Sequence, residues 1–131
     1  NVNIENIPSG IDSFSVVVEG SQVKNCNFEL INEIYSVQGV TDVEIEEGIS
    51  LIAVVGRNMA NIPGVAGKLF KALGDSNINI KIIVQSTVEL SIIVGVSNDD
   101  YESALNIIYR DFYLVNKKTS LSKWCFCLVR N

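Results

Sequence analysis

The chain has 131 residues, 47% of them hydrophobic and 19% charged, and a net charge of −5 at pH 7, which indicates a packed globular protein of one domain or two small ones. The acidic balance and the scattered Lys and Arg argue against a nucleic-acid partner, and every apolar run is too short to cross a membrane. The chain contains no histidine, which removes Ser/His and Cys/His catalysis and the usual metal ligands, so we expect no metal site.

The first 48 residues predict two strands, a helix and a third strand. Residues 2–7 alternate apolar and polar side chains as a half-buried strand does, and residues 14–18 form a second strand after the turn at Pro8. Apolar side chains at helical spacing then predict a helix from about residue 28 to Gly39. Residues 41–45 follow as a short strand before an acidic turn.

Residues 49–83 predict a strand, a loop, an amphipathic helix and a second strand without a gap. Residues 49–55 are almost wholly apolar, as in a strand that has other strands on both sides. Pro63 and Gly64 suit a helix start, and apolar residues recur at helical spacing until Gly74. Strand alternation resumes over residues 78–82.

An internal repeat relates the two parts of the chain. Residues 1–7 (NVNIENI) correspond to residues 77–83 (NINIKII), and residues 14–18 correspond to residues 90–94. After this, Ser97 and Asn98 are suited to cap a helix over about residues 99–112. The second copy therefore reads β, α, β, β, α, and the apolar run 124–129 supplies a last strand at a sheet edge.

Such a doubled split βαβ pattern predicts an α+β protein made of tandem ferredoxin-like units (βαββαβ), each an antiparallel sheet with its helices on one face. Residues 1–48 form a partial first unit (ββαβ), which is incomplete at its N-terminus, and residues 49–131 form the second unit with a C-terminal tail. Interleaving of strands between the units stays open. Because the first unit lacks its opening strand and helix, its sheet exposes apolar surface, and we expect a dimer.

The termini and cysteines suggest where the chain belongs. It begins with Asn1 instead of methionine, inside an expected strand, so we expect a piece of a longer polypeptide. Three cysteines without CxxC spacing and the lack of a signal-peptide pattern favour a reduced, cytoplasmic setting. Cys125 and Cys127 share one side of a strand, where packing is favoured over redox chemistry.

No set of side chains forms a catalytic constellation. The sequence indicates no pocket with an acid or base partner for Glu44, Glu46 and Glu47, which fit a solvated turn. Lys68 and Lys71 lie away from the apolar face of the expected helix, so they fit surface charges better than a Schiff-base lysine. We therefore predict no catalytic residues.

The loop over residues 57–65 is the best candidate for a binding site. It offers a row of backbone amides at a helix N-terminus, which attracts an anion such as the carboxylate of a free amino acid. Asn77 and Asn79 follow on the next strand and offer polar contacts for an ammonium group. The alternative is that Asn77 only closes the turn and Asn79 faces solvent.

Six segments resemble the paired ACT domains at the C-terminus of aspartokinase, of the lysine-sensitive type. They lie within about residues 1–113 and read IENIPSGIDSFSVVV, SLIAVVGRNM, PGVAGKLFKAL, NINIKII, VELSIIVGV and YESALNIIYRDF. The resemblance implies a non-catalytic regulatory module that binds a free amino acid, lysine, and inhibits aspartate phosphorylation by a separate kinase domain in lysine, threonine and methionine biosynthesis. It also implies a homodimer through the ACT sheets and no cofactor in this chain, since ATP and magnesium belong to the kinase domain.

The same resemblance implies the effector-binding residues. In the first unit the family's segment falls on Asn3, Ile4 and Glu5, where an acidic side chain would meet an ammonium group. The equivalent positions of the second unit are Ile62, Gly64, Val65, Asn77, Asn79 and Ile80.

Two other functions stay open. One is an ACT-type amino-acid sensor of another enzyme, which the absence of an upstream kinase domain would favour. The other is a small hydrolase of the acylphosphatase kind with Arg57 holding phosphate, which an assay of acyl phosphate hydrolysis would test.

Overall fold

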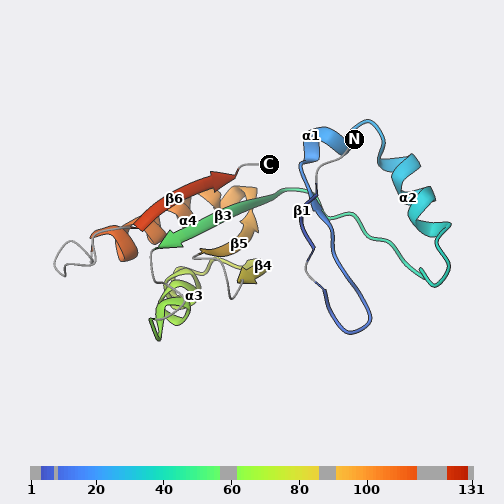
Figure 1. The fold of residues 1–131 in the computed structure, drawn as a ribbon. Helices are drawn as coiled ribbons and strands as arrows, with labels where there is room; N and C mark the ends of the chain where they lie inside the picture. Colours follow the sequence, from blue (N-terminus) through green and yellow to red (C-terminus); the bar gives the residue numbers. More distant parts are fainter. Residues whose placement is uncertain (1–3, 8, 57–61, 86–90, 115–123, 130–131) are drawn as a thin grey trace. The chain divides into compact units, whose positions relative to one another are not determined.

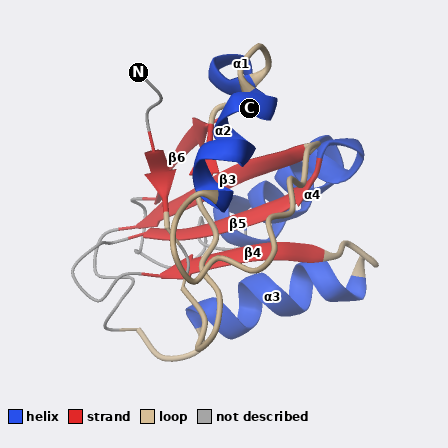
Figure 2. Cartoon of the chain, turned by 90° about the vertical axis from the view of Figure 1, so that its right-hand side faces the viewer, coloured by secondary structure: helices blue, strands red, loops and turns tan. Residues whose placement is uncertain are grey.

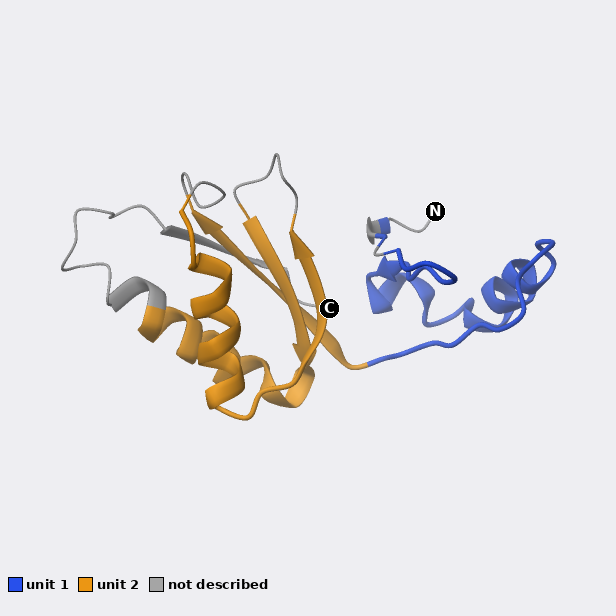
Figure 3. Ribbon diagram, turned by 90° about the horizontal axis from the view of Figure 1, so that it is seen from below, with its two compact units in different colours: residues 1–47, 131 blue, residues 48–130 orange. Residues whose placement is uncertain are grey.

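The computed structural model describes residues 4–7, 9–56, 62–85, 91–114 and 124–129 (Figure 1). The chain divides into two compact units, a first unit of residues 1–47 and a second unit of residues 48–130 (Figure 3). Each unit is described by itself.

The second unit has the order βαββαβ. Its strands are β3 (Ile49–Gly56), β4 (Ile80–Gln85), β5 (Ser91–Ser97) and β6 (Trp124–Val129), and its two α-helices are α3 (Val65–Asp75) and α4 (Tyr101–Ile108). The strands form one antiparallel sheet in the order β4-β5-β3-β6. This is the ferredoxin-like arrangement that the sequence predicts, and the apolar run 124–129 is confirmed as its last strand, at the sheet edge beside β3.

A single hydrophobic core joins one face of the sheet to both helices, which lie on the same side of it (Figure 3). The core takes alternate residues of the strands β3 and β5 and one apolar stripe from each helix, because side chains on a strand point to opposite faces while those on a helix recur every three or four residues. Its members are Ile52, Val54, Val65, Leu69, Leu73, Ile78, Ile92, Val94, Val96, Ala104 and Ile108.

The opposite face of the sheet contains one very close contact. A side chain at Gly95 in β5 would place its Cβ atom 2.8 Å from the Cβ atom of Ile82 and 3.2 Å from Cγ2 of Ile49. These distances leave no room for a methyl group, so glycine lets β5 lie between its two neighbouring strands with their isoleucines folded over it.

The segment after β5 differs from the single capped helix that the sequence predicts. A short 3₁₀ turn, η2 (Asn98–Asp100), precedes α4, and a π-helical segment, η3 (Tyr109–Leu114), follows it. Neither Ser97 nor Asp100, the residues before η2 and α4, makes a side-chain cap hydrogen bond. The helix predicted over about residues 99–112 is confirmed as a helical run of residues 98–114 made of these consecutive segments. The prediction that Ser97 and Asn98 cap it is wrong, because the Ser97 side chain makes no cap hydrogen bond and the Asn98 side chain bonds to Ser50 in β3 instead.

The first unit contains less regular structure. The strands β1 (Ile4–Asn6) and β2 (Val17–Val18) form an antiparallel pair, followed by the helices α1 (Gly20–Val23) and α2 (Asn27–Tyr35). None of its described residues is buried. Large apolar side chains lie in solvent instead, among them Ile11, Phe14 and Phe28, with Phe28 78% exposed, which agrees with the predicted apolar surface.

The third strand predicted at residues 41–45 is not formed, since residues 40–48 contain neither helix nor strand. The Tyr35 hydroxyl lies 3.2 Å from Asp42 Oδ1 and accepts a hydrogen bond of 3.1 Å from the Val43 N–H. A backbone group that a strand would offer to a neighbouring strand is thus bonded to a side chain. In the second unit the corresponding last strand pairs with the opening strand β3, and the described residues of the first unit contain no counterpart of β3 with which residues 41–45 could pair.

No helix in the described part of the chain is both long enough and apolar enough to cross a membrane.

Candidate functional site

The N-terminus of α3 presents backbone groups to solvent. Gly64 precedes the helix with a φ of 86°, a left-handed conformation that glycine adopts readily. It is exposed and has no side chain to cap the first turn. A helix N-terminus of this kind offers backbone N–H groups to an anion. The Val65 side chain, by contrast, is only 8% exposed and belongs to the core. Gly64 and Val65 therefore offer a ligand their backbone groups and not their side chains.

The other predicted effector-binding residue near this helix end, Ile62, lies within the described part of the chain. Ile62 is half-buried and packs against the core. Residues 57–61, which make up most of the predicted anion-binding loop, lie outside the described residues.

The C-terminus of α3 ends in a Schellman motif built on Asn77. Asn77 has a φ of 58°, its N–H donates to the Gly74 carbonyl at 2.9 Å, and the Ile78 N–H donates to the Leu73 carbonyl at 3.0 Å. Ile78 and Leu73 are both buried, which supplies the hydrophobic contact that usually accompanies this motif. The backbone at Asn77 therefore serves to close the helix, as in the alternative that the sequence left open.

Asn77 and Asn79 both expose their side chains, while Ile80 is half-buried against the core. These three residues lie at one end of α3, and Gly64 lies at the other. Because α3 has 11 residues, its ends are roughly 16 Å apart, and the turn after the helix leads directly back into β4 (Figure 2). The structure thus separates the two halves of the predicted site, and one small amino acid cannot contact both within one unit.

The first-unit positions are only partly described. Ile4 in β1 pairs with Val18 of β2 and is 58% exposed. The backbone of Glu5 lies in the same strand, whereas its side chain and the whole of Asn3 lie outside the described part of the chain.

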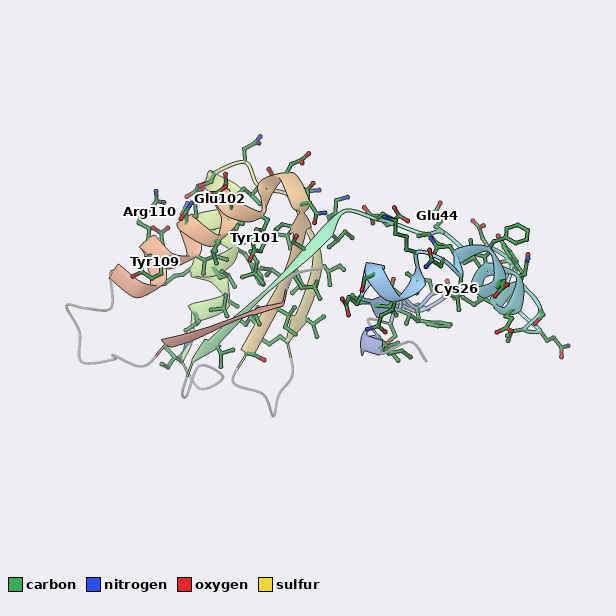
Figure 4. All side chains as sticks on the ribbon, turned by 90° about the horizontal axis from the view of Figure 1, so that it is seen from above. Cys26, Glu44, Tyr101, Glu102, Tyr109 and Arg110 are labelled. Carbon is green, nitrogen blue, oxygen red and sulfur yellow. The ribbon has the colours of Figure 1, made fainter. Side chains whose placement is uncertain are left out.

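The charged residues considered for catalysis lie on the surface. Glu44 and its acidic neighbours Glu46 and Glu47 are exposed on the irregular segment between α2 and β3 (Figure 4). Lys68 is exposed, and Lys71 forms an exposed ion pair of 2.7 Å with Asp75 one turn later. These positions agree with the predicted solvated turn and surface charges. Among the described residues no group of Cys, Asp and Glu is arranged to hold a metal ion.

Two ionisable groups, the Glu19 carboxyl and the Arg110 guanidinium, have shifted pKa values. Glu19 accepts hydrogen bonds from the Ser21 hydroxyl at 2.7 Å and the Gln22 amide at 2.8 Å, and these bonds lower the pKa of its carboxyl group. Arg110 donates to Asp111 at 2.8 Å, a hydrogen bond and charge pairing that raise the pKa of the guanidinium. The ionisable groups of Glu19 and Arg110 are both exposed, and neither residue is among those predicted for the candidate site.

Sequence reasoning missed one polar pair in the second unit. The hydroxyl of Ser50, in β3, donates to Asn98 Oδ1 at 2.6 Å. Ser50 occupies an inward position two residues before the core residue Ile52, so a serine within an otherwise apolar strand was the available signal.

The comparison with protein families matches part of this unit. Residues 52–112 match the family model described as "ACT domain". The match begins in β3 and ends in η3, so it covers the opening strand, both α-helices and the two strands between them.

Known proteins similar to the chain are aspartokinases. It is 29% identical over 110 residues to Aspartokinase 3 of Bacillus subtilis (strain 168), covering 83% of this chain and 24% of that protein. The structure of an aspartate kinase from Clostridium acetobutylicum, described as an allosteric enzyme, is similar with a TM-score of 0.82 and 38% identity over 86% of this chain and 26% of that one. The chain thus spans about a quarter of the length of these two proteins.

A shorter solved protein shows a similar fold. The ligand-free regulatory subunit of aspartate kinase from Thermus thermophilus has a TM-score of 0.71 and 22% identity, covering 85% of this chain and 73% of that subunit. At this identity the likeness concerns the fold alone.

Proposed function

Residues 52–112 form an ACT domain in a chain that is similar to aspartokinases, and from this we propose that the chain is a regulatory module that binds a free amino acid, lysine. Binding would inhibit the phosphorylation of aspartate by a kinase domain of the full protein, as feedback in lysine, threonine and methionine biosynthesis. The observation that carries the proposal is the complete βαββαβ unit of residues 48–130, whose fold is like that of an allosteric aspartate kinase.

The exposed helix N-terminus at Gly64 supports the binding of an amino acid. The backbone N–H groups of its first turn, which has no side-chain cap, and the positive end of the helix dipole favour a carboxylate. Asn79, exposed at the other end of α3, offers a carbonyl oxygen that can accept hydrogen bonds from an ammonium group. The predicted residues therefore offer hydrogen-bond donors for the carboxylate of a free amino acid and an acceptor for its ammonium group.

The distance between the two ends of α3 supports a binding site shared between two copies of the chain. Within one chain these groups lie roughly 16 Å apart, at the two ends of α3. A ligand would therefore contact the α3 N-terminus of one copy of the chain and the residues after α3 of a second copy. A homodimer joined at the edges of the ACT sheets would bring two such ends together, because β4 and β6 are the edge strands of each sheet.

Inhibition requires a difference in affinity between two arrangements. Lysine would have to bind the inhibited arrangement of the module more tightly than the active one, and couplings of this kind change affinity by about 5- to 150-fold. The kinase domain, ATP and magnesium belong to this proposal and not to the present chain.

Isothermal titration calorimetry of the purified chain tests the proposal. We expect saturable heat with lysine and none with threonine, methionine or aspartate at the same concentrations. Affinity should rise with chain concentration if the site lies between two copies. Asn79→Ala should weaken lysine binding about tenfold, whereas Asn106→Ala, an exposed asparagine on α4, should not change it. No heat with any of the four amino acids would overturn the proposal.

An ACT-type sensor for another enzyme is the second candidate, because the match to the ACT model does not by itself specify the enzyme that is regulated. Saturable binding of a comparison amino acid with no binding of lysine would favour that function.

A further inference from the structure

Ser50 is a buried polar residue in the apolar strand β3. It is 3% exposed, and its hydroxyl donates a hydrogen bond of 2.6 Å to Asn98 Oδ1. A buried hydroxyl without a hydrogen-bond partner costs free energy, so this bond holds the Asn98 side chain against the beginning of β3. The contact joins residues that are 48 positions apart in the chain.

The backbone of Asn98 makes a second contact with the same region. Its N–H donates to the Gly48 carbonyl at 2.8 Å. Gly48 has a φ of 77° and is the first residue of the second unit, directly after the irregular residues 40–47. Asn98 itself begins η2, the turn that leads into α4. Asn98 is therefore bonded to the segment where the chain enters the second unit, and it also begins the turn that leads into α4.

We propose that Gly48, Ser50 and Asn98 form a hinge clamp that ends the irregular linker at Gly48 and ties that point to the start of α4. A displacement of α4 is then transmitted to the position where the chain leaves the second unit, through the backbone bond from Asn98 to Gly48. The Asn98 side chain keeps this bond in place, because its attachment to buried Ser50 prevents the turn η2 from moving away from β3. Ser50 and Asn98 act as positioning residues in this device.

A purely structural role would have a different signature. If the Ser50–Asn98 bond only stabilised the fold, its loss would raise hydrogen exchange throughout the core of the second unit. If it forms a hinge clamp, its loss affects the Asn98 amide, which donates to Gly48, and the backbone at Gly48 and Ile49, while exchange in the core stays nearly constant. Residue-specific exchange separates the two cases.

The first variant is Ser50→Ala in the full chain, studied by NMR with ¹⁵N labelling and no ligand. Asn98 is exposed, so its freed carbonyl oxygen can bond to water and no buried group is left unpaired. We expect exchange of the Asn98 amide to rise roughly fivefold to tenfold, the magnitude of one lost hydrogen bond. Backbone order at Gly48 and Ile49 should fall, with core amides such as Leu69 changing less than about twofold.

The second variant is Asn98→Ala, which keeps the backbone N–H but leaves the Ser50 hydroxyl buried without its partner. We expect it to loosen Gly48 in the same way and to destabilise the unit more than Ser50→Ala does. The double variant should be more stable than Asn98→Ala alone, because it removes the orphaned hydroxyl. Ser103→Ala and Asn106→Ala, which change exposed residues of the same types on α4, are the matched controls.

Two results would overturn the hinge clamp. One is wild-type exchange at Asn98 with wild-type order at Gly48 in both variants. The other is a uniform rise of exchange at Asn98 and in the core, which would indicate stabilisation alone. The regulatory use of the clamp rests on the proposed function, but this experiment contains no ligand, so its failure is distinguishable from a failure of lysine binding.

Discussion

The two units contain related sequences with opposite degrees of burial. Ile4 of the first unit corresponds by the internal repeat to Ile80 of the second, and Val18 corresponds to Val94. Ile4 is 58% exposed while Ile80 packs against the core, and Val18 is half-buried while Val94 is fully buried. The same residue types at the same repeat positions thus differ in burial because of their surroundings.

The opening strand and helix account for this difference. In the second unit β3 and α3 supply Ile52, Val54, Val65, Leu69 and Leu73 to the core, and the described residues of the first unit contain no counterpart of either element. Without these elements, the strands and helices of the first unit have no second layer against which to bury their apolar side chains, and a stable domain needs at least two packed layers. In this chain the missing layer, and not the composition of the remaining one, decides which unit has a core.

The test with the largest expected effect on stability replaces one apolar side chain in each unit. Leu69→Ala should lower the free energy of unfolding of the second unit by about 2–5 kcal/mol, because it removes a fully buried side chain and leaves a cavity. Phe28→Ala, at a position that is 78% exposed, should change stability by less than about 0.5 kcal/mol. Urea unfolding of the two variants measures both values. A large loss with Phe28→Ala would mean that the side chain is covered in solution.

A second test concerns the close packing that only the second unit possesses. Gly95→Ala should destabilise it by about 1–3 kcal/mol, since the new methyl group collides with Ile82 and Ile49. Gly67→Ala is the matched control, because nothing lies within 4 Å of its Cβ position on α3, and it should stabilise the helix by up to about 1 kcal/mol. Thermal unfolding monitored by circular dichroism reports both changes. Equal effects of the two variants would contradict the packing at Gly95.

Local pattern predicted the second unit well, because each of its elements has the periodicity that its surroundings require. The apolar strand at residues 49–55, the stripe on α3 and the last strand at residues 124–129 all follow from spacing alone. The first unit was predicted less well, since the alternation of residues 41–45 indicates a strand but supplies no partner for it. Strand pairing is a tertiary property, and here the Val43 N–H donates to the side chains of Tyr35 and Asp42 instead of to a neighbouring strand.

The candidate site illustrates a second limit of sequence reasoning. Gly64 and Asn77 are 13 positions apart in the sequence, yet a straight helix holds them at opposite ends. The chemistry of each end was predictable from a helix start and a helix stop, whereas their separation depends on the length of the helix between them. Asn98 is similar, because its type suits a helix cap but its contact with Ser50 depends on where β3 lies.

A third test measures how strongly the turn after α3 constrains its asparagine. Asn77→Val should destabilise the second unit by about 1–2 kcal/mol, because a β-branched residue is disfavoured at a φ of 58°. Asn77→Gly should be neutral or slightly stabilising, since glycine is the usual residue at this position of a Schellman motif. Urea unfolding checks both, and lysine titration of the glycine variant then separates the turn from any contact of the side chain with a ligand. Tolerance of valine would contradict the left-handed conformation.

The smallest expected effect lies in the first unit, where α1 depends on exposed hydrogen bonds instead of a core. The carboxylate of Glu19 accepts bonds from Ser21 and Gln22, and these bonds hold its pKa below the ordinary value. A folded-state pKa that is depressed contributes stability above the unfolded pKa, and the contribution is lost as pH falls through the folded one. Acidification from about pH 5 to pH 3 should therefore loosen α1.

Amide chemical shifts of Ser21 and Gln22, followed through this pH range, measure that loosening. Glu19→Gln should remove the titration, because a neutral amide keeps an acceptor oxygen but has no charge to lose. The Leu69 amide should keep its shift over the same range, since no described residue of the core cluster carries a carboxylate. If Ser21 and Gln22 titrate equally in the wild type and in Glu19→Gln, another carboxylate controls α1, and the contrast between a unit held by its core and one held by surface bonds loses this support.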